Sequence, residues 1–320
     1  MTGTDGPAID PETKRGAQTM IRRPKSDPGS LASVLLLVLA GVLGCHSLKF
    51  TQPVLDKPEK TDRDPIAVAP AKYQMRLSQY LFLADFELKR DPALFRELAD
   101  LRDQVQKELQ LPSANTLIQV YIFEDRPRYE TFMQARYPDL PKRRAFFVAQ
   151  PHSVGGPEDL LVYTFWGERV RQDLRHELTH ALLHSVLKDV PLWLDEGLAE
   201  YFEVPPDAQG LNVHHLEQIQ LASSASFRPN LAHLEELSQV RQMTPAEYRE
   251  AWAWVHLLLR DKPEAKAVLT QYLQQLRVTS NPGPLQPRVA TVFPEMEAAL
   301  CQHLAKLDSN RPSVPAANGS

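Results

Sequence analysis

The chain has 320 residues, enough for one large domain or two modest ones. Its hydrophobic fraction of 43% is sufficient for a core, and its formal net charge of −4 provides no basic field, so we expect no nucleic-acid partner. Two cysteines cannot form a disulfide framework, and the 27 prolines, many of them toward the two ends, indicate linkers there.

An apolar run near the N-terminus predicts an export signal within residues 1–45. The run covers residues 31–43, and three basic residues lie just before it, at positions 22–25. A short apolar run behind basic residues is typical of a secretory signal, whereas a membrane-spanning helix needs about 20 residues. We therefore favour a cleaved signal over an uncleaved N-terminal anchor.

The run ends in Val42-Leu43-Gly44-Cys45, which resembles a bacterial lipobox. The resemblance implies that the signal is cut before Cys45 and that the sulfur of this residue is acylated. Either this lipid or an uncleaved anchor would hold the chain at a membrane, so we expect an exported protein of the bacterial cell envelope. The residues before Met20 do not resemble a signal, so translation is expected to start at Met20 rather than Met1.

Two segments are expected to flank one folded domain at 73–306. Residues 46–72 are rich in Pro, Lys and Asp without a hydrophobic period, which predicts a flexible linker. Residues 307–320 are polar and Pro-containing, which predicts a disordered tail. Cys301 lies in an apolar-periodic segment and is expected to be buried.

Within this domain, the hydrophobic pattern changes from alternating strands and helices in 73–168 to helices alone in 169–306. The predicted strands are 80–83, 117–123, 145–149 and 160–165, and the predicted helices among them are 92–109 and 127–136. The later predicted helices are 170–187, 192–203, 212–222, 245–260, 263–277 and 288–305. A small mixed sheet followed by a helical half predicts an α+β fold.

A His-Glu-x-x-His pattern occupies residues 176–180, in the first of the later helices. Positions i and i+4 share one face of a helix, so His176 and His180 can reach one ion, and zinc is the metal that this pattern typically binds. Glu177 lies one residue further round, where it can activate a water without being a ligand. Two packed or solvated histidines are the alternative, because so short a motif also arises by chance.

A third ligand is expected from the next helix. Pro191 suits the first turn of a helix, and the short Lys188–Val190 segment allows only a tight turn, so the two helices must pack antiparallel or steeply crossed. This return directs Glu196 toward the two histidines and would complete the His₂Glu set of a thermolysin-type zinc site. His184 lies about 12 Å along the helix from His176, too far to share the ion.

Residues 193–203, WLDEGLAEYFE, resemble the WLNEGFA-type helix of gluzincin aminopeptidases, which are thermolysin-like zinc metallopeptidases. More loosely, 73–280 is similar to exported bacterial proteins with a peptidase-MA-like domain. The resemblance implies a zincin-like fold with the active-site helix at the junction of its halves, and Glu196 as a zinc ligand. In the thermolysin pattern a carboxylate one turn after the ligand accepts from the second N–H of a ligand histidine, a role that we give to Glu200, with a solvated charge as the alternative. Glu203 is expected in solvent. Asp195 points about 100° away from Glu196 and is expected to orient or cap.

The segment from Tyr248, YREAWAWVHLLL, resembles a second gluzincin element, the helix opening YxKG, although Lys-Gly is replaced here by Glu-Ala. The resemblance implies that Tyr248 stabilises the oxyanion; a tyrosine packed on the core is the alternative. His214 and His215 are second-choice donors, and only one of them can face the site. In the resembling enzymes an edge strand before the metal helix pairs with the substrate, a role that we assign to 160–165. A GxMEN-like element, which captures a free N-terminus, is not found in 140–170, so an endopeptidase-like cleft is expected.

These features predict a zinc-dependent metallopeptidase that hydrolyses a peptide or protein substrate, with Glu177 as general base. Two alternatives stay open. One is a zinc hydrolase that acts on another kind of bond, because a fold and a metal do not fix the substrate. The other is a catalytically silent, surface-tethered zinc-binding or scaffold protein, against which Glu177 argues because zinc binding alone does not need it.

Overall fold

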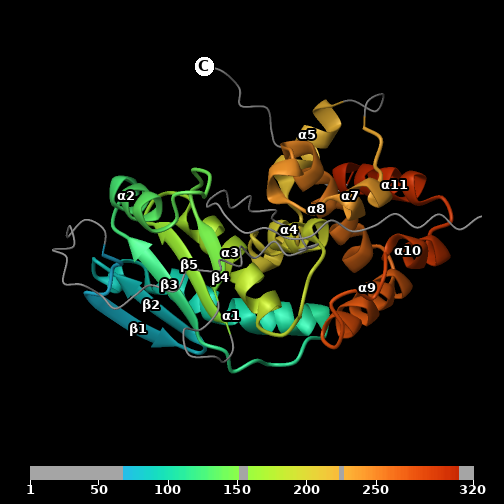
Figure 1. Ribbon diagram of the computed structural model, residues 1–320. Coiled ribbons are helices and arrows are strands. Elements are labelled where there is room, and N and C mark those ends of the chain that lie inside the picture. The colour runs from blue at the N-terminus through green and yellow to red at the C-terminus, as the bar shows by residue number, and fades with distance from the viewer. Residues whose placement is uncertain (1–67, 151–157, 223–226, 310–320) are drawn as a thin grey trace, which may run out of the picture. The chain divides into compact units, whose positions relative to one another are not determined.

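The computed structural model describes residues 68–150, 158–222 and 227–309. These residues form a mixed sheet in the N-terminal half and a mostly helical C-terminal half, the α+β arrangement that the sequence predicts (Figure 1). The expected signal segment 1–45 with Cys45, most of the linker and most of the tail lie outside the described residues. Among the residues described, no helix has the length and apolar character that crossing a membrane requires.

The five-stranded sheet consists of β1 (Tyr73–Leu77), β2 (Tyr80–Ala84), β3 (Ile118–Phe123), β4 (Phe146–Gln150) and β5 (Asp159–Phe165), in the order β1-β2-β3-β5-β4. The three central strands are parallel, while β1 and β4 run antiparallel to their neighbours. The prediction that 160–165 is the edge strand is therefore wrong. The chain returns after β4 to place β5 between β3 and β4, so β4 is the edge.

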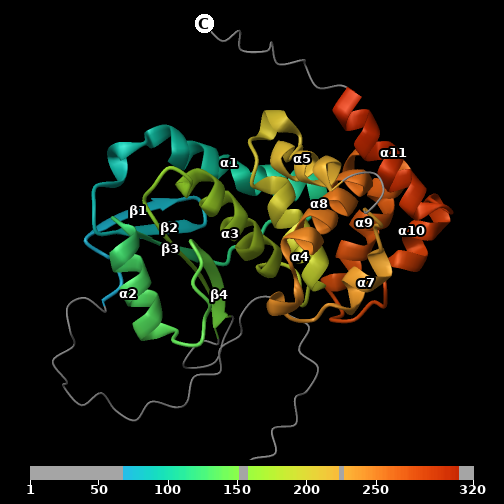
Figure 2. The same ribbon diagram turned by 90° about the horizontal axis from the view of Figure 1, so that it is seen from above.

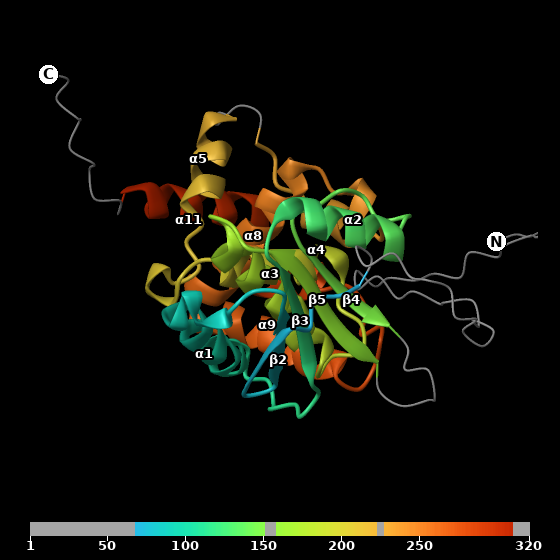
Figure 3. The ribbon, with the colours of Figure 1, turned by 90° about the vertical axis from the view of Figure 1, so that its left-hand side faces the viewer.

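Helices cover both faces of the sheet (Figures 2 and 3). On one face, alternate side chains such as Val120 and Val162 join a core with α1 (Pro92–Leu109) and α3 (Val170–His184). On the other, Leu161 and Tyr163 pack with α2 (Arg126–Arg136). This alternation follows from the two-residue period of a strand. The helix α3 follows β5 directly in the chain and packs against this face of the sheet.

The helical half contains the elements α4 (Leu192–Phe202), α5 (Val213–Leu221), α7 (Leu231–Glu236), α8 (Pro245–Arg260), α9 (Pro263–Leu276), α10 (Gln286–Val292) and α11 (Met296–Ser309), with short 3₁₀ helices η2 (Leu88–Arg90), η3 (Pro206–Ala208) and η4 (Val240–Gln242). The single helix predicted at 288–305 is wrong. It is divided because Pro294 has no N–H to donate and restricts the residue before it. The last helix also continues past Leu307, where the tail was expected to begin.

The closest helix packing in the structure is between α4 and α8. A Cβ atom added to Gly197 would lie 2.6 Å from the backbone oxygen of Ala251 and 2.9 Å from a methyl carbon of Val255. Both distances are shorter than van der Waals contact, so no side chain fits between the two backbones here. Trp193 and Trp252 are fully buried beside this contact and fill the space around it.

We predict that Gly197→Ala destabilises the protein by about 1–3 kcal/mol, because backbone atoms of α8 cannot move aside for the new methyl group. Chemical denaturation of wild type and variant measures the difference. Gly167→Ala is the matched control, since its Cβ would come no closer than 3.5 Å to a neighbour. Equal stability of the two variants would contradict the close packing.

A buried chain of hydrogen bonds joins α8 to α11. Nδ1 of His256 and Nε2 of His303 are 2.8 Å apart, and Nδ1 of His303 is 3.3 Å from Oδ1 of Asp261. The arrangement fits two neutral imidazoles, in which His303 donates to the carboxylate and accepts from His256. Burial lowers the pKa of His256 to about 3, and its neighbours His303 and Arg260 act in the same direction.

We predict that the protein loses stability as the pH falls below about 6.5. There His256 binds a proton in the unfolded chain but stays neutral in the folded protein. The group contributes a slope of about 1.4 kcal/mol per pH unit down to its folded pKa. Urea denaturation at about pH 7.5 and about pH 5 should therefore show a smaller acid-induced loss in His256→Gln than in wild type. His214→Gln, at an exposed position, should retain the full loss.

Cys301 is exposed, so its predicted burial is wrong. It lies two residues before the buried His303 on α11, and residues two apart on a helix face in nearly opposite directions.

Candidate metal centre

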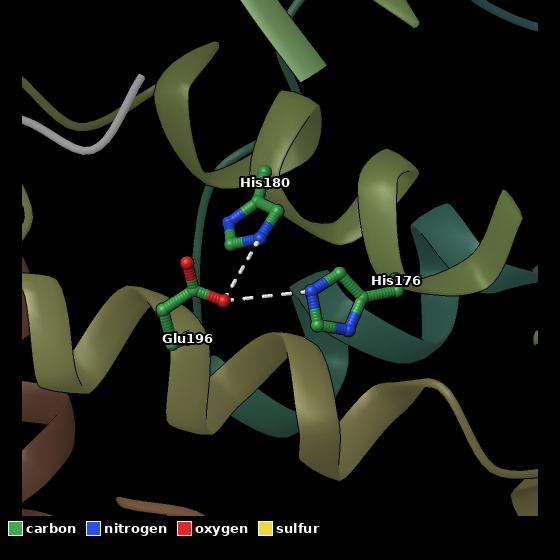
Figure 4. Close-up of side chains that lie close together, drawn as sticks. All are labelled: His176, His180 and Glu196. Atoms are coloured by element: carbon green, nitrogen blue, oxygen red, sulfur yellow. Dashed lines mark ion pairs between the residues drawn. The ribbon is translucent and has the colours of Figure 1, made fainter. Parts of the chain in front are cut away.

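The tight turn between α3 and α4 brings the three predicted ligands together (Figure 4). Oε2 of Glu196 lies 3.5 Å from Nε2 of His176 and 3.7 Å from Nε2 of His180. Donor atoms on a tetrahedral ion, at bond lengths of about 2.0–2.1 Å, are about 3.3 Å apart. The three side chains can therefore hold a metal ion with only small adjustments.

The carboxylate of Glu196 fits a cation for a second reason. Its Oε2 is buried and has no hydrogen-bond partner in the described part of the chain. A buried carboxylate oxygen without a donor is costly, and a divalent ion would remove that cost. Burial would lower the pKa of His176, but the carboxylates of Glu196 and Glu203 raise it well above its ordinary value, so the surroundings favour positive charge at this point.

Carboxylates lie against the far nitrogen of each imidazole. Nδ1 of His176 is 3.1 Å from Oε2 of Glu203, and Nδ1 of His180 is 3.0 Å from Oδ1 of Asp195, the latter outside hydrogen-bonding geometry. These contacts favour a proton on each Nδ1, which leaves both Nε2 lone pairs directed at Glu196 and free for a metal.

The carboxylate behind His176 is not the one that the sequence predicted. Glu200, which was expected there, is 2.7 Å from Nε2 of His215 on α5. Glu203, which was expected in solvent, is 7% exposed and also accepts hydrogen bonds from Gln172 at 2.6 Å and Asn212 at 2.9 Å. Glu203 lies two turns after Glu196 and thus reaches the side of His176 that faces away from Glu196.

A buried arginine next to His176 fixes the position of Glu203. Arg175 is fully buried, and its Nε donates to the carbonyl oxygen of Phe202 at 2.9 Å. Its other nitrogens contact Glu97 and Gln104 on α1 at 3.2 and 2.9 Å. Arg175 precedes His176 in the chain and Phe202 precedes Glu203, so this contact holds the two functional residues close together. No sequence pattern indicated it.

Asp195 connects the two histidines in the second half of α3. Its Oδ2 is 3.0 Å from Nε2 of His184, in addition to the contact with His180. Burial would raise the pKa of Asp195, but the two imidazoles hold it below its ordinary value. His184 also stacks on Phe147 of β4, with ring centroids 5.4 Å apart, so its contacts are those of a packed structural residue.

Glu177 faces a cleft of about 730 Å³ together with the three candidate ligands. The edge strand β4 and the segment Ser238–Met243 form other parts of its wall. Burial raises the pKa of Glu177, while His176 and His180 act in the opposite direction. A carboxyl group with a raised pKa is a stronger proton acceptor than an ordinary carboxylate, as a general base requires.

Tyr248 and an arginine that the sequence did not suggest lie beside these residues. The hydroxyl of Tyr248 accepts a hydrogen bond from Nη2 of Arg143 at 3.2 Å. Burial and the negative charge of Glu196 raise the pKa of Tyr248 to about 12, so the hydroxyl keeps its proton at neutral pH. Of the second-choice donors, His215 turns inward to Glu200 and His214 is exposed. Arg143 lies in a loop, where no periodic pattern could have indicated it.

Residues 171–285 match a family described as "Protein of unknown function (DUF1570)". The matched stretch covers most of α3 and all of α4 and α8. It therefore includes the three candidate metal ligands, His176, His180 and Glu196. A search of curated proteins found no match to the chain.

We predict that Glu203→Gln weakens the binding of a divalent ion such as Zn²⁺ by about 10–100-fold, because the amide holds the ligand imidazole without the negative charge. Competition with a chelator of known affinity measures the change. Glu200→Gln is the matched control, one turn earlier on α4, and should have the smaller effect. A larger effect of Glu200→Gln would assign the supporting role to Glu200 instead.

Proposed function

We propose that the protein is a gluzincin-type zinc metallopeptidase that hydrolyses peptide bonds. The observation that carries this proposal is the convergence of two Nε2 atoms and one carboxylate oxygen beside Glu177, on the wall of a cleft. Two histidines and a glutamate form the donor set of thermolysin-class zinc, and the adjacent glutamate is the base that such hydrolysis needs.

Zinc, when bound, would lower the pKa of a water and polarise the scissile carbonyl. Glu177 would take the proton of the attacking water and deliver it to the leaving amine, a role that suits a carboxyl with a raised pKa on the wall of the cleft. Glu203 and Asp195 would keep the imidazoles oriented. Tyr248, protonated and within reach of Arg143, would donate to the oxygen on which negative charge develops.

The edge strand favours a peptide over other substrates. Within the described residues β4 pairs only with β5, so the other edge of β4 leaves backbone N–H and C=O groups for an extended chain. Ala145, Phe146 and Phe147, at the start of this strand, line the cleft. A peptide can add to such an edge as a further strand, and this role belongs to β4 rather than to 160–165.

We further propose that the protein is exported and held at a membrane of the cell envelope through Cys45 or an uncleaved anchor. A zinc hydrolase of another bond and a silent zinc-binding scaffold remain the alternatives. Glu177 supports an enzyme over a scaffold, since it lines the cleft beside the candidate ligands but is not one of the three residues that could hold the ion.

We predict that the purified protein contains close to one zinc per chain, that Glu196→Ala loses most of it, and that Glu177→Gln retains it but no longer hydrolyses peptides. Elemental mass spectrometry measures the metal and a protease screen measures turnover. Glu264→Ala, at an exposed position on α9, is the control for both. An absence of zinc in the wild type after reconstitution would refute the proposal, and turnover by Glu177→Gln would remove the role given to Glu177.

A further inference from the structure

Arg143 lies where two hollows meet at the candidate metal centre. It lines the cleft of about 730 Å³ and also a smaller hollow of about 240 Å³ on the side of Glu203. His176 and Glu177 line the same two hollows. A group that is bound next to the metal centre is therefore within the reach of this guanidinium.

No acidic side chain in the described part of the protein forms an ion pair with Arg143. Among the described residues, its one side-chain hydrogen bond runs from Nη2 to the hydroxyl of Tyr248. A guanidinium has five N–H donors, so most of its hydrogen-bonding capacity remains available. The contact with Tyr248 fixes the direction of the side chain without using its charge.

Other cations line the same cleft. Lys142 precedes Arg143, and Arg241 of η4 lies in the wall segment Ser238–Met243. Neither forms an ion pair with the acidic side chains that the structure describes. Apart from Glu177 and Glu196, which belong to the metal centre, Asp139 is the acidic residue of the described lining. With a divalent ion at the metal centre, the ion and the three cationic side chains together outweigh the three carboxylates of the lining, and such a cleft attracts anionic groups.

We propose, on the basis of the peptidase function above, that the cleft selects peptides with a carboxylate beside the bond that is attacked, and that Arg143 binds this carboxylate. A guanidinium and a carboxylate form two parallel charge-assisted hydrogen bonds, a geometry that a lysine cannot provide. An Asp or Glu side chain and the free C-terminus of a short peptide present the same group.

Peptide binding tests the proposal without turnover. Full-length Glu177→Gln protein, loaded with zinc, is titrated with three fluorescent peptides of one parent sequence, and anisotropy is recorded. The first has an internal Glu and an amidated C-terminus, the second has Gln and an amidated C-terminus, and the third has Gln and a free C-terminus. We expect one carboxylate peptide to bind about tenfold more tightly than the neutral peptide. Tighter binding of the first peptide would identify an acidic side chain as the recognised carboxylate, and tighter binding of the third would identify the free C-terminus.

Two comparisons assign this preference to Arg143. Adding Arg143→Gln should abolish the difference between the peptides, while Arg249→Gln, an arginine of α8 outside the cleft lining, should preserve it. Raising the salt concentration should reduce the preference in the parent protein, which gives a readout that does not depend on any variant. Equal affinity for all three peptides would overturn the proposal.

Kinetics with zinc-loaded enzyme separates this role from the alternative of an oxyanion donor. A carboxylate anchor predicts that Arg143→Gln raises KM for the preferred peptide much more than for the neutral peptide. A fall in kcat for all peptides alike would show an oxyanion donor and overturn the specificity role. A binding preference without turnover in the wild type would refute the peptidase function alone, whereas turnover with equal affinities would refute the selectivity alone.

Discussion

The guanidinium of Arg175 has no contact with water, so its charge and its donors must be satisfied inside the protein. They are satisfied by α1 on one side and by the C-terminal end of α4 on the other, which fixes three helices relative to one another. A second constraint lies at Gly197, where the close approach of the two backbones sets the position of α4 against α8. His176 and Glu196 each adjoin one of these residues in the chain, so the site takes its geometry from the core packing beside it.

Much of the site could be read from the sequence because its geometry is local. The spacing of His176 and His180 places both on one helix face, and the short turn after α3 leaves few ways for α4 to return. Helix limits were equally accessible where capping is local. The helix 92–109 was predicted with the limits that it has, and it begins where the Asp91 side chain accepts from the N–H of Leu94 at 2.9 Å.

The predictions that failed depend on how elements meet in space. Glu200 and Glu203 both lie roughly on the helix face of Glu196, and only the crossing of α3 and α4 decides which one reaches His176. The order of strands along the chain does not give their order in the sheet, so β5 was mistaken for the edge. Arg143 belongs to a loop, whose path is set by the cleft around it and by its contact with Tyr248.

The network around Glu203 bears on the order of folding and metal uptake. Glu203 is held by Gln172 and Asn212 as well as by His176, and the helices that carry the site pack through fully buried side chains. The framework of the site therefore comes from the core, unlike that of a zinc finger, whose folding free energy is supplied by the ion. Such a chain can complete its fold first and acquire its ion afterwards, in whichever compartment provides it.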